Sequence, residues 1–322
     1  MIKYIYFCSL IFIVKSFKGI NWFGFETTNN CIYYEKNNVD YYLKKLNELG
    51  FNAIRLPISV EIINNNYKPQ IWNEEYKEKN FQEIMEDLFI KTRYYNISIL
   101  IDIHRLKSGI SSPVWYIPED ELYTEEYIIN TYYKIIDRYN NNENFIGIDL
   151  FNEPHYNTTM IEWKNYIEKV INLFEKRYIK PFNIVINGID WGKNLSDFET
   201  NPLNMKEINK FKNCIKYSPH LYGPSLNYIQ SYEKEKLYEY WNKLFGFINS
   251  KDIWIGEWGG RFNNTLDLLW IDTLIEYINE KKINSHFFWA LNPNSNDVDG
   301  LFNTDWTTIN DNVLNRIKNI KE

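Results

Sequence analysis

FIGIDLFNEPH (residues 145–155) is the stretch of sequence that decides the fold. Among its first seven residues only Asp149 is charged. Apolar residues at nearly every position are typical of a strand that is buried on both faces of a parallel sheet. Polar residues follow the apolar run, beginning with Asn152 and Glu153. The stretch therefore predicts a buried parallel strand that ends in polar side chains.

Seven further short apolar runs of the same kind occur along the chain. They are INWFGF (20–25), NAIRLPI (52–58), ISILIDIH (97–104), NIVING (183–188), IKYSPHLY (215–222), DIWIGEW (252–258) and SHFFWAL (285–291). Amphipathic stretches lie between the runs. Residues 39–49 place apolar side chains on one helical face before Gly50. Thr159 and Glu162 form a capping box ahead of another apolar face.

Eight buried strands that alternate with helical or loop sequence predict an α/β protein, a (β/α)8 TIM barrel in a single domain. The 322 residues are sufficient for such a barrel, which needs about 250. A doubly wound open sheet is the alternative. It lacks support because no glycine-rich phosphate-binding loop follows the first apolar run.

The composition argues against one class of partner and favours another. Lys and Arg total 36 and Asp and Glu total 42, so the net charge of -6 gives no reason to expect nucleic-acid binding. The 26 Tyr residues accompany a general excess of Ile, Lys and Asn, which explains their number without a function. The same excess does not explain the 11 Trp residues, and the flat Trp side chain stacks well on sugar faces.

The first 16 residues differ from the rest of the chain. Lys3 precedes an apolar stretch at 4–14 that is too short to span a bilayer, which needs about 20 residues. This pattern is typical of a signal peptide. We therefore expect residues 1–16 to be a signal peptide and residues 17–322 to be a secreted, extracellular catalytic domain, monomeric and free of the membrane. A buried first strand and a membrane anchor are the alternatives.

The chain has three Cys residues, of which Cys8 lies in the apolar N-terminal stretch. The remaining pair, Cys31 and Cys214, is too few for a disulfide framework. The sequence leaves open whether these two residues pair.

Polar side chains recur at the carboxyl ends of the expected strands, where (β/α)8 enzymes carry their active sites. They are Arg55, His104, Asn152, Glu153, His220, Tyr222, Glu257 and Trp289. Glu153 and Glu257 end the fourth and seventh runs, so they can face each other across the barrel mouth. Glycoside hydrolysis uses two such carboxyl groups. No His or Cys cluster has the spacing of a metal site, and we expect neither a metal nor another cofactor.

Five segments carry a family resemblance. They are GINWFGFET (19–27), IRLPIS (54–59), IDLFNEPH (148–155), IGEWGG (255–260) and FFWALNPNSNDVDG (287–300). With them the chain resembles glycoside hydrolase family 5 of clan A, and its cellulase group in particular, from about Gly19 to about Trp306. The resemblance implies a retaining endo-β-1,4-glucanase that acts on a β-glucan through a covalent glycosyl-enzyme. The same machinery on mannan, xyloglucan or mixed-linkage glucan, and a non-catalytic glycan-binding barrel, are the alternatives.

The resemblance also implies roles for the residues around the two carboxyl groups. Glu153 would be the acid/base and Glu257 the nucleophile. Asn152 would hydrogen-bond the 2-hydroxyl group of the sugar at the cleavage site. Arg55 and Tyr222 would contact the nucleophile, and a cation beside a carboxylate favours its ionised form.

Histidine and tryptophan residues complete the expected site. By the same resemblance His104 and His220 would line the cleavage subsite, and Trp289 would form the platform under the sugar. A cis peptide bond is expected directly after Trp289. Trp22 and Trp191 lie at or just past strand ends, where they are candidates for stacking on further sugars.

Overall fold

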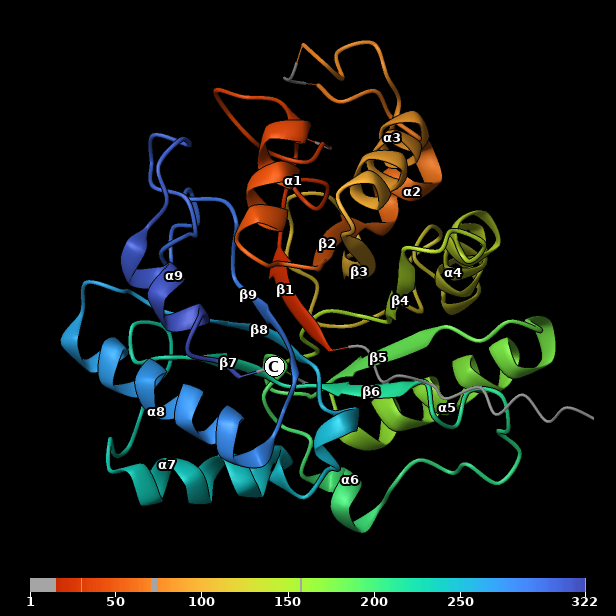
Figure 1. Ribbon diagram of the computed structural model, residues 1–322. Coiled ribbons are helices and arrows are strands. Elements are labelled where there is room, and N and C mark those ends of the chain that lie inside the picture. Colours follow the sequence, from red (N-terminus) through yellow and green to blue (C-terminus); the bar gives the residue numbers. More distant parts are fainter. Residues whose placement is uncertain (1–15, 30, 71–73, 157, 322) are drawn as a thin grey trace, which may run out of the picture.

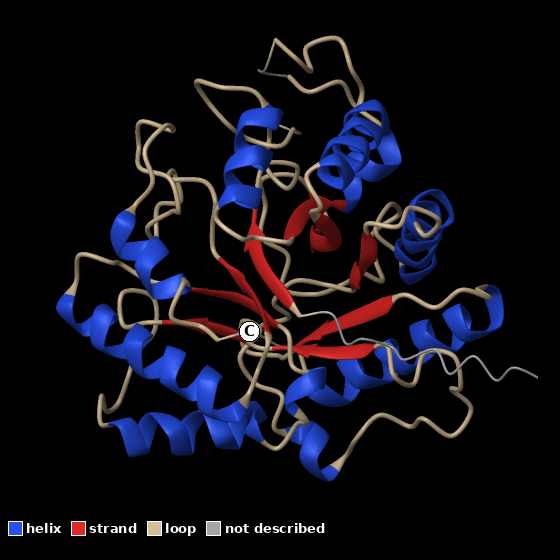
Figure 2. Cartoon of the chain, viewed as in Figure 1, coloured by secondary structure: helices blue, strands red, loops and turns tan. Residues whose placement is uncertain are grey.

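The computed structural model describes residues 16–29, 31–70, 74–156 and 158–321. Within these residues the strands form one parallel sheet that is rolled into a barrel, and helices surround it (Figures 1 and 2). The strands are β1 (Phe17–Asn21), β2 (Ala53–Ser59), β3 (Ser98–Arg105), β4 (Phe145–Asp149), β5 (Asn183–Asn187), β6 (Ile215–Ser218), β7 (His220–Tyr222), β8 (Ile255–Gly259) and β9 (Ser285–Phe288).

The order of the strands around the sheet explains how the barrel closes. The order is β6-β5-β4-β3-β2-β1-β9-β8-β7, and neighbouring strands pair in parallel. The two outer strands, β6 and β7, are halves of a single expected strand that is interrupted at Pro219. Tyr217 forms a bridge with Ile253, just before β8. The sheet is therefore nearly closed, which confirms the (β/α)8 barrel and excludes the doubly wound open sheet.

The first strand begins earlier than the sequence predicted. We expected residues 20–25, but β1 starts at Phe17 and ends at Asn21. Its register explains the difference, because Phe17 to Ile20 pair with Ser285 to Phe288 of β9. Beyond Asn21 the chain stays beside β2, because the Trp22 N–H donates to the Arg55 carbonyl oxygen and Phe25 forms a parallel bridge with Ile58.

The helices of the described residues follow the expected alternation. They are α1 (Val39–Glu48), α2 (Val60–Asn65), α3 (Phe81–Tyr94), α4 (Glu125–Tyr139), α5 (Met160–Arg177), α6 (Asp197–Thr200), α7 (Lys234–Trp241), α8 (Thr265–Lys281) and α9 (Asp311–Ile317), with a π-helical turn at Asn242–Gly246 and a 3-10 turn at Ser250–Asp252. The capping box of Thr159 and Glu162 is present at the start of α5. Gly50, which follows α1, has the positive φ of 83° that favours glycine.

Apart from Ser16, the expected signal peptide lies outside the described residues. Among the helices of the described residues, none combines the length and the hydropathy that a membrane span requires. Cys31 is buried and Cys214 is half-buried, and both are free thiols, so the two do not pair.

Candidate active site

A cleft of about 600 Å³ opens at the carboxyl ends of the strands. Seven of the site residues proposed from the sequence line it, namely His104, Asn152, Glu153, Trp191, Tyr222, Glu257 and Trp289. Arg55 and His220 are fully buried and contact the two glutamates at the base of the cleft. The structure therefore gathers residues from seven different strands or strand ends at one place.

Arg55 on β2 is the centre of a buried charged network. Its Nη1 donates to Glu257 Oε1 at 2.7 Å, and its Nη2 donates to Asn152 Oδ1 at 2.9 Å. The same Nη2 lies 3.1 Å from Asp102 Oδ1 and 3.0 Å from Asp149 Oδ2. Nη1 also donates to Asn21 Oδ1 on β1 at 3.0 Å. Because partners from β1, β3 and β4 hold the planar guanidinium, one edge of it is aimed at Glu257.

Glu257 on β8 accepts hydrogen bonds at both of its oxygens. Arg55 occupies Oε1, and the Tyr222 hydroxyl donates to Oε2 at 2.6 Å. Burial, together with the neighbouring Glu257 and Glu153, raises the pKa of Tyr222 well above its usual value, so its hydroxyl keeps its proton and donates. Two donors held in this way fix the carboxylate in one orientation, as an attacking group requires.

Glu153 lies directly after β4 in a different environment. Burial raises its pKa from 4.5 to about 7, against the lowering effect of Arg55, Lys193 and Arg105, although 18% of its side chain remains exposed to the cleft. Its backbone has a positive φ of 51°, which is uncommon for a residue with a side chain. A carboxyl group that holds its proton near neutral pH is suited to act as a general acid.

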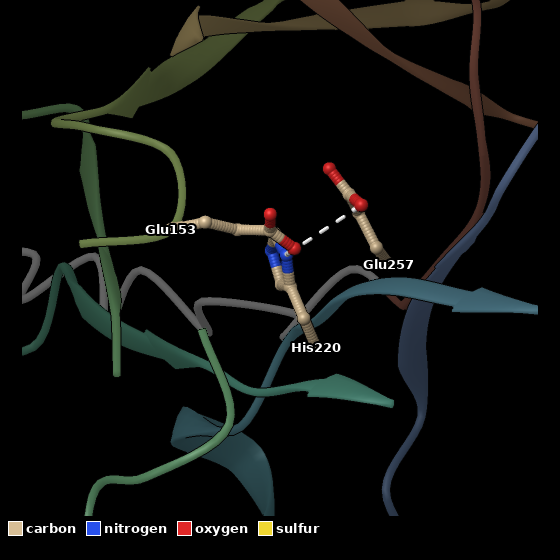
Figure 3. A group of neighbouring side chains, drawn as sticks. All are labelled: Glu153, His220 and Glu257. Carbon is tan, nitrogen blue, oxygen red and sulfur yellow. Dashed lines mark hydrogen bonds and ion pairs between the residues drawn. The ribbon is translucent and has the colours of Figure 1, made fainter. Parts of the chain in front are cut away.

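The two glutamates face each other, and the His220 ring lies beside both carboxyl groups. Figure 3 shows the carboxyl groups of Glu153 and Glu257 pointing toward one another, with the imidazole beside them. His220 Nδ1 lies 2.9 Å from Glu153 Oε1 and 3.6 Å from Glu257 Oε2. One oxygen of each carboxyl group and this nitrogen all lie within 4.8 Å of one another. A metal ion could bridge such a spacing, but His220 Nδ1 is already paired with Glu153, and we assign no metal ligand.

Trp289 and its neighbours form an aromatic wall of the cleft. Its ring stacks on His104 at 5.6 Å and on Phe23 at 5.7 Å, with interplanar angles of 17° and 15°. The peptide bond after Trp289 is cis, as expected. Burial lowers the pKa of His104 well below its usual value, so the ring is neutral, with Nδ1 2.6 Å from Asp102 Oδ2.

Trp22 is a correction to the sequence analysis. Its side chain is fully buried, and its Nε1 donates to the Tyr33 carbonyl oxygen at 2.8 Å. It cannot stack on a sugar. The residue that lines the cleft is the next one, Phe23, because successive side chains of an extended chain point to opposite sides and Trp22 packs against Tyr42 of α1.

Trp191 lies where a platform could act. Its side chain is 39% exposed, lines the cleft and stacks on the His155 ring at a centroid distance of 3.5 Å. The His155 ring is fixed in turn, because its Nδ1 contacts the Glu153 carbonyl oxygen at 2.6 Å. Trp191 is therefore supported from below and open to the cleft above.

Residues that the sequence did not single out also hold the site, and Asn21, which accepts from Arg55, is one of them. Asp102 and Asp149 flank Arg55, and Asn187 donates from Nδ2 to Asp149 Oδ1 at 2.8 Å. A signal for the two aspartates was present, because each is the lone acidic residue inside an otherwise apolar run. A charge inside a buried strand needs a partner.

Comparison with known proteins agrees with this geometry. Residues 14–295 match the family model described as cellulase (glycosyl hydrolase family 5). An endoglucanase from Paenibacillus polymyxa is 31% identical over 331 residues, covering 92% of this chain and 80% of that protein. The major extracellular endoglucanase of Xanthomonas campestris is 28% identical and covers 95% of this chain and 68% of that protein.

Solved structures resemble the whole barrel. A complex of an endocellulase variant from Pyrococcus horikoshii with cellotetraose has a TM-score of 0.86 at 27% identity, covering 96% of this chain and 93% of the other. The catalytic domain of the major endoglucanase from Xanthomonas campestris has a TM-score of 0.85 at 26% identity, covering 95% and 94%.

Proposed function

The chain belongs to the cellulases of glycosyl hydrolase family 5, and from this premise we propose that it is a retaining endo-β-1,4-glucanase. The observation that carries the proposal is the difference between its two facing glutamates. Glu257 is held by two donors, whereas Glu153 has a raised pKa of about 7. Two carboxyl groups with separate environments perform the two roles that glycoside hydrolysis needs.

In the first step, Glu257 attacks the anomeric carbon of the sugar at the cleavage site. The new carbon–oxygen bond forms as the glycosidic bond breaks, and the Glu153 proton goes to the departing oxygen. The product is a glycosyl ester of Glu257 and a shortened glucan chain. Arg55 and Tyr222 orient the attacking carboxylate, and Asn152, fixed by Arg55, hydrogen-bonds the 2-hydroxyl group of that sugar.

In the second step, Glu153 acts as a base. It takes a proton from a water molecule, whose oxygen attacks the anomeric carbon and breaks the ester to Glu257. Two inversions leave the original anomeric configuration. The closeness of the carboxyl oxygens, within 4.8 Å, supports this pathway, because retaining enzymes place the groups about 5–5.5 Å apart and inverting enzymes about 6.5–9.5 Å.

The proposed substrate is a β-1,4-glucan such as cellulose. Support comes from the names of the relatives and from the cellotetraose complex of the Pyrococcus endocellulase. The aromatic rings of Trp289 and Trp191 give the cleft two surfaces on which sugar rings can stack. The presence of both glutamates argues against a non-catalytic binding barrel.

Secretion is part of the proposal. A relative from Xanthomonas campestris is named an extracellular endoglucanase. With the apolar N-terminal stretch, this supports a signal peptide at residues 1–16 and a catalytic domain at residues 17–322 that works outside the cell.

The test is a substrate panel. Residues 17–322 are assayed for reducing-sugar release from carboxymethyl cellulose, galactomannan and xyloglucan. We expect carboxymethyl cellulose to be cut, and Glu257→Gln to lose at least about four orders of magnitude in kcat, as when an enzyme loses its nucleophile. Glu239→Gln is the matched control, because Glu239 is exposed and pairs only with Lys236 among the ion pairs of the described residues.

Each outcome of the panel decides a different point. Cleavage of galactomannan or xyloglucan in place of the cellulose derivative would replace the substrate and keep the mechanism. A folded protein that cuts no β-glycan would rule out the enzymatic function. Proton NMR identifies the anomeric configuration of the first product formed, and an inverted configuration would exclude the double displacement.

A further inference from the structure

The two ring nitrogens of His220 have different surroundings. Nδ1 faces both glutamates, at 2.9 Å from Glu153 Oε1 and 3.6 Å from Glu257 Oε2. Nε2 points to the opposite side, where it is buried and has no hydrogen-bond partner among the described residues. Burial lowers the pKa of His220 to about 3, so the ring is neutral and carries a single N–H.

Ser218 lies next to this unpaired nitrogen. Its Oγ is also buried without a hydrogen-bond partner in the part of the chain that the structure describes. A methyl group added at Gly256 would lie 2.1 Å from Ser218 Oγ and 2.8 Å from His220 Nε2. Both atoms therefore border the same small space beside Gly256, directly before the nucleophile Glu257. Two unpaired polar atoms that share one buried space are uncommon in a native protein.

The His220 ring is not free to turn toward another partner. A methyl group at Gly192 would lie 2.7 Å from His220 Cγ, and the His220 backbone N–H donates to the Gly192 carbonyl oxygen at 3.2 Å. Gly192 and Gly256 thus enclose the ring from two sides. Ser218 Oγ and His220 Nε2 are not hydrogen-bonded to each other in the structure, but the Ser218 side chain can change rotamer about its Cα–Cβ bond and so bring Oγ to Nε2.

We propose that the Ser218 hydroxyl donates to His220 Nε2 and thereby fixes the imidazole tautomer that carries its proton on Nδ1. A proton on Nδ1 has an acceptor in Glu153 Oε1 at 2.9 Å, with Glu257 Oε2 at 3.6 Å, whereas a proton on Nε2 has no acceptor among the described side chains as they stand. A donor at Nε2 selects the same tautomer from the other side of the ring. Ser218 is therefore a positioning residue that acts through His220.

This tautomer matters because it supports one form of Glu153. An Nδ1–H group donates to Glu153 Oε1 and stabilises the ionised carboxylate, which is the base of the second step. The catalytic meaning of the inference rests on the proposed function, but the tautomer itself does not. The titratable and charged groups that face His220 are Glu153 after β4, Glu257 on β8, Arg55 on β2 and His104 on β3.

Nitrogen NMR of the full chain tests the tautomer directly. The sequence contains 4 His residues, so labelling with ¹⁵N-histidine gives few signals, and a His220→Gln variant identifies those of His220. We expect the wild type to show Nδ1–H and Ser218→Ala to move toward Nε2–H or a mixture. Ser218→Cys, with its weaker S–H donor, should lie between them. A wild type with Nε2–H, or a Ser218→Ala spectrum unchanged at His220, overturns the inference.

Kinetics test the consequence for Glu153. The alkaline limb of kcat/KM reports loss of the acid proton, so Ser218→Ala should move that limb upward by about half a pH unit, the size that one neutral hydrogen bond allows. With an aryl cellobioside that has a good leaving group, kcat should fall more than kcat/KM, because the second step limits the rate. An alkaline limb that stays in place overturns this part.

Ser285→Ala is the matched control. Ser285 is also a buried serine, but its Oγ accepts from the Phe17 N–H at 3.2 Å, at the start of β9. It should alter stability and leave the alkaline limb unchanged, and a shift as large as that of Ser218→Ala would count against the inference. A wild type that is inactive on every β-glycan but shows the serine-dependent tautomer would support the inference while overturning the proposed function.

Discussion

The two ends of the barrel interior carry different kinds of side chain, apolar at one end and polar at the other, on the same strands. Toward the amino ends of the strands, the interior is filled by apolar side chains. These are Phe17, Ala53, Leu100, Val185, Trp254 and Phe287. Two residues further along β2, β3 and β5, the same face of each strand carries Arg55, Asp102 and Asn187. Because side chains alternate along a strand, the apolar residue of each of these three strands lies directly below a polar one.

The difference between these layers shows how the site is kept rigid. The apolar layer stabilises the barrel through burial. The polar layer places a cation among buried carboxyl groups, and burial raises the pKa of Asp102 and of Asp149 against the lowering effect of Arg55. Buried ion pairs add little net stability, yet removing one partner is strongly destabilising. The polar layer therefore orients the nucleophile, and the apolar layer carries the stability that makes this possible.

Arg55→Met breaks the polar layer and should have the largest effect. It leaves three carboxyl groups buried around an uncharged side chain, so we expect a loss of about 3–5 kcal/mol in the free energy of unfolding. The catalytic rate should also fall by about 10²-fold or more, because Glu257 loses a fixed donor. Chemical denaturation and kcat/KM measure the two effects. An Arg55→Met protein with wild-type activity would show that the guanidinium does not orient the nucleophile.

Leu100→Ala breaks the apolar layer on the neighbouring strand. Leu100 is fully buried, so the cavity should lower the free energy of unfolding by about 2–5 kcal/mol. We expect kcat to stay near the wild-type value at temperatures where the variant is folded, because the charged network above it is intact. Denaturation and kcat are measured at the same temperature. A fall in kcat comparable to that of Arg55→Met would mean that the two layers are not separable.

Glu26→Gln tests the effect of burying a carboxyl group outside the barrel interior. Burial raises the pKa of Glu26 from 4.5 to about 7, while its Oε2 still accepts from the Gly24 N–H. The folded state favours the protonated form. The stability contribution of Glu26 is therefore complete below about pH 4.5 and is lost as the pH rises through about 7.

The measurement is the free energy of unfolding at pH 4.5 and at pH 8. Glutamine cannot ionise, so the wild type should lose up to about 3 kcal/mol more than Glu26→Gln between these two values. The exposed Glu239→Gln variant should follow the wild type. Equal pH dependence in Glu26→Gln and the wild type would show that Glu26 ionises normally.

The sequence was informative about the polar layer and less so about how its members pair. Asn152, Glu153 and Glu257 could be placed at one end of the barrel because each follows a recognisable apolar run. The contact of Arg55 with Asp102 and Asp149 depends on the strand register, which a single sequence does not state.

Two differences between the expected and the observed strands have separate physical causes. The first apolar run continued through Trp22 to residue 25, but pairing with β9 moved the strand toward the amino terminus. Trp22 lies in the core and Phe23 in the cleft because successive side chains of the extended chain alternate in direction. In the sixth run, Pro219 cannot donate a backbone hydrogen bond, and the single strand expected there is two strands, β6 and β7. The apolar pattern predicted the first strand correctly and its ends incorrectly, whereas in the sixth run it predicted the ends correctly and missed the interruption.

His286→Gln should have the smallest effect and compares two histidines of one barrel. His286 on β9 is buried like His220, and burial lowers the pKa of each to about 3. Its Nδ1 accepts from Trp258 Nε1 at 3.2 Å, and no hydrogen bond or ion pair among the described residues joins it to either glutamate. Because glutamine can also accept this bond, we expect a loss of at most about 1 kcal/mol in the free energy of unfolding and an unchanged pH–rate profile. His220→Gln should change that profile through Glu153. Equal profiles for the two variants would mean that the role of a buried histidine here does not depend on its position in the barrel.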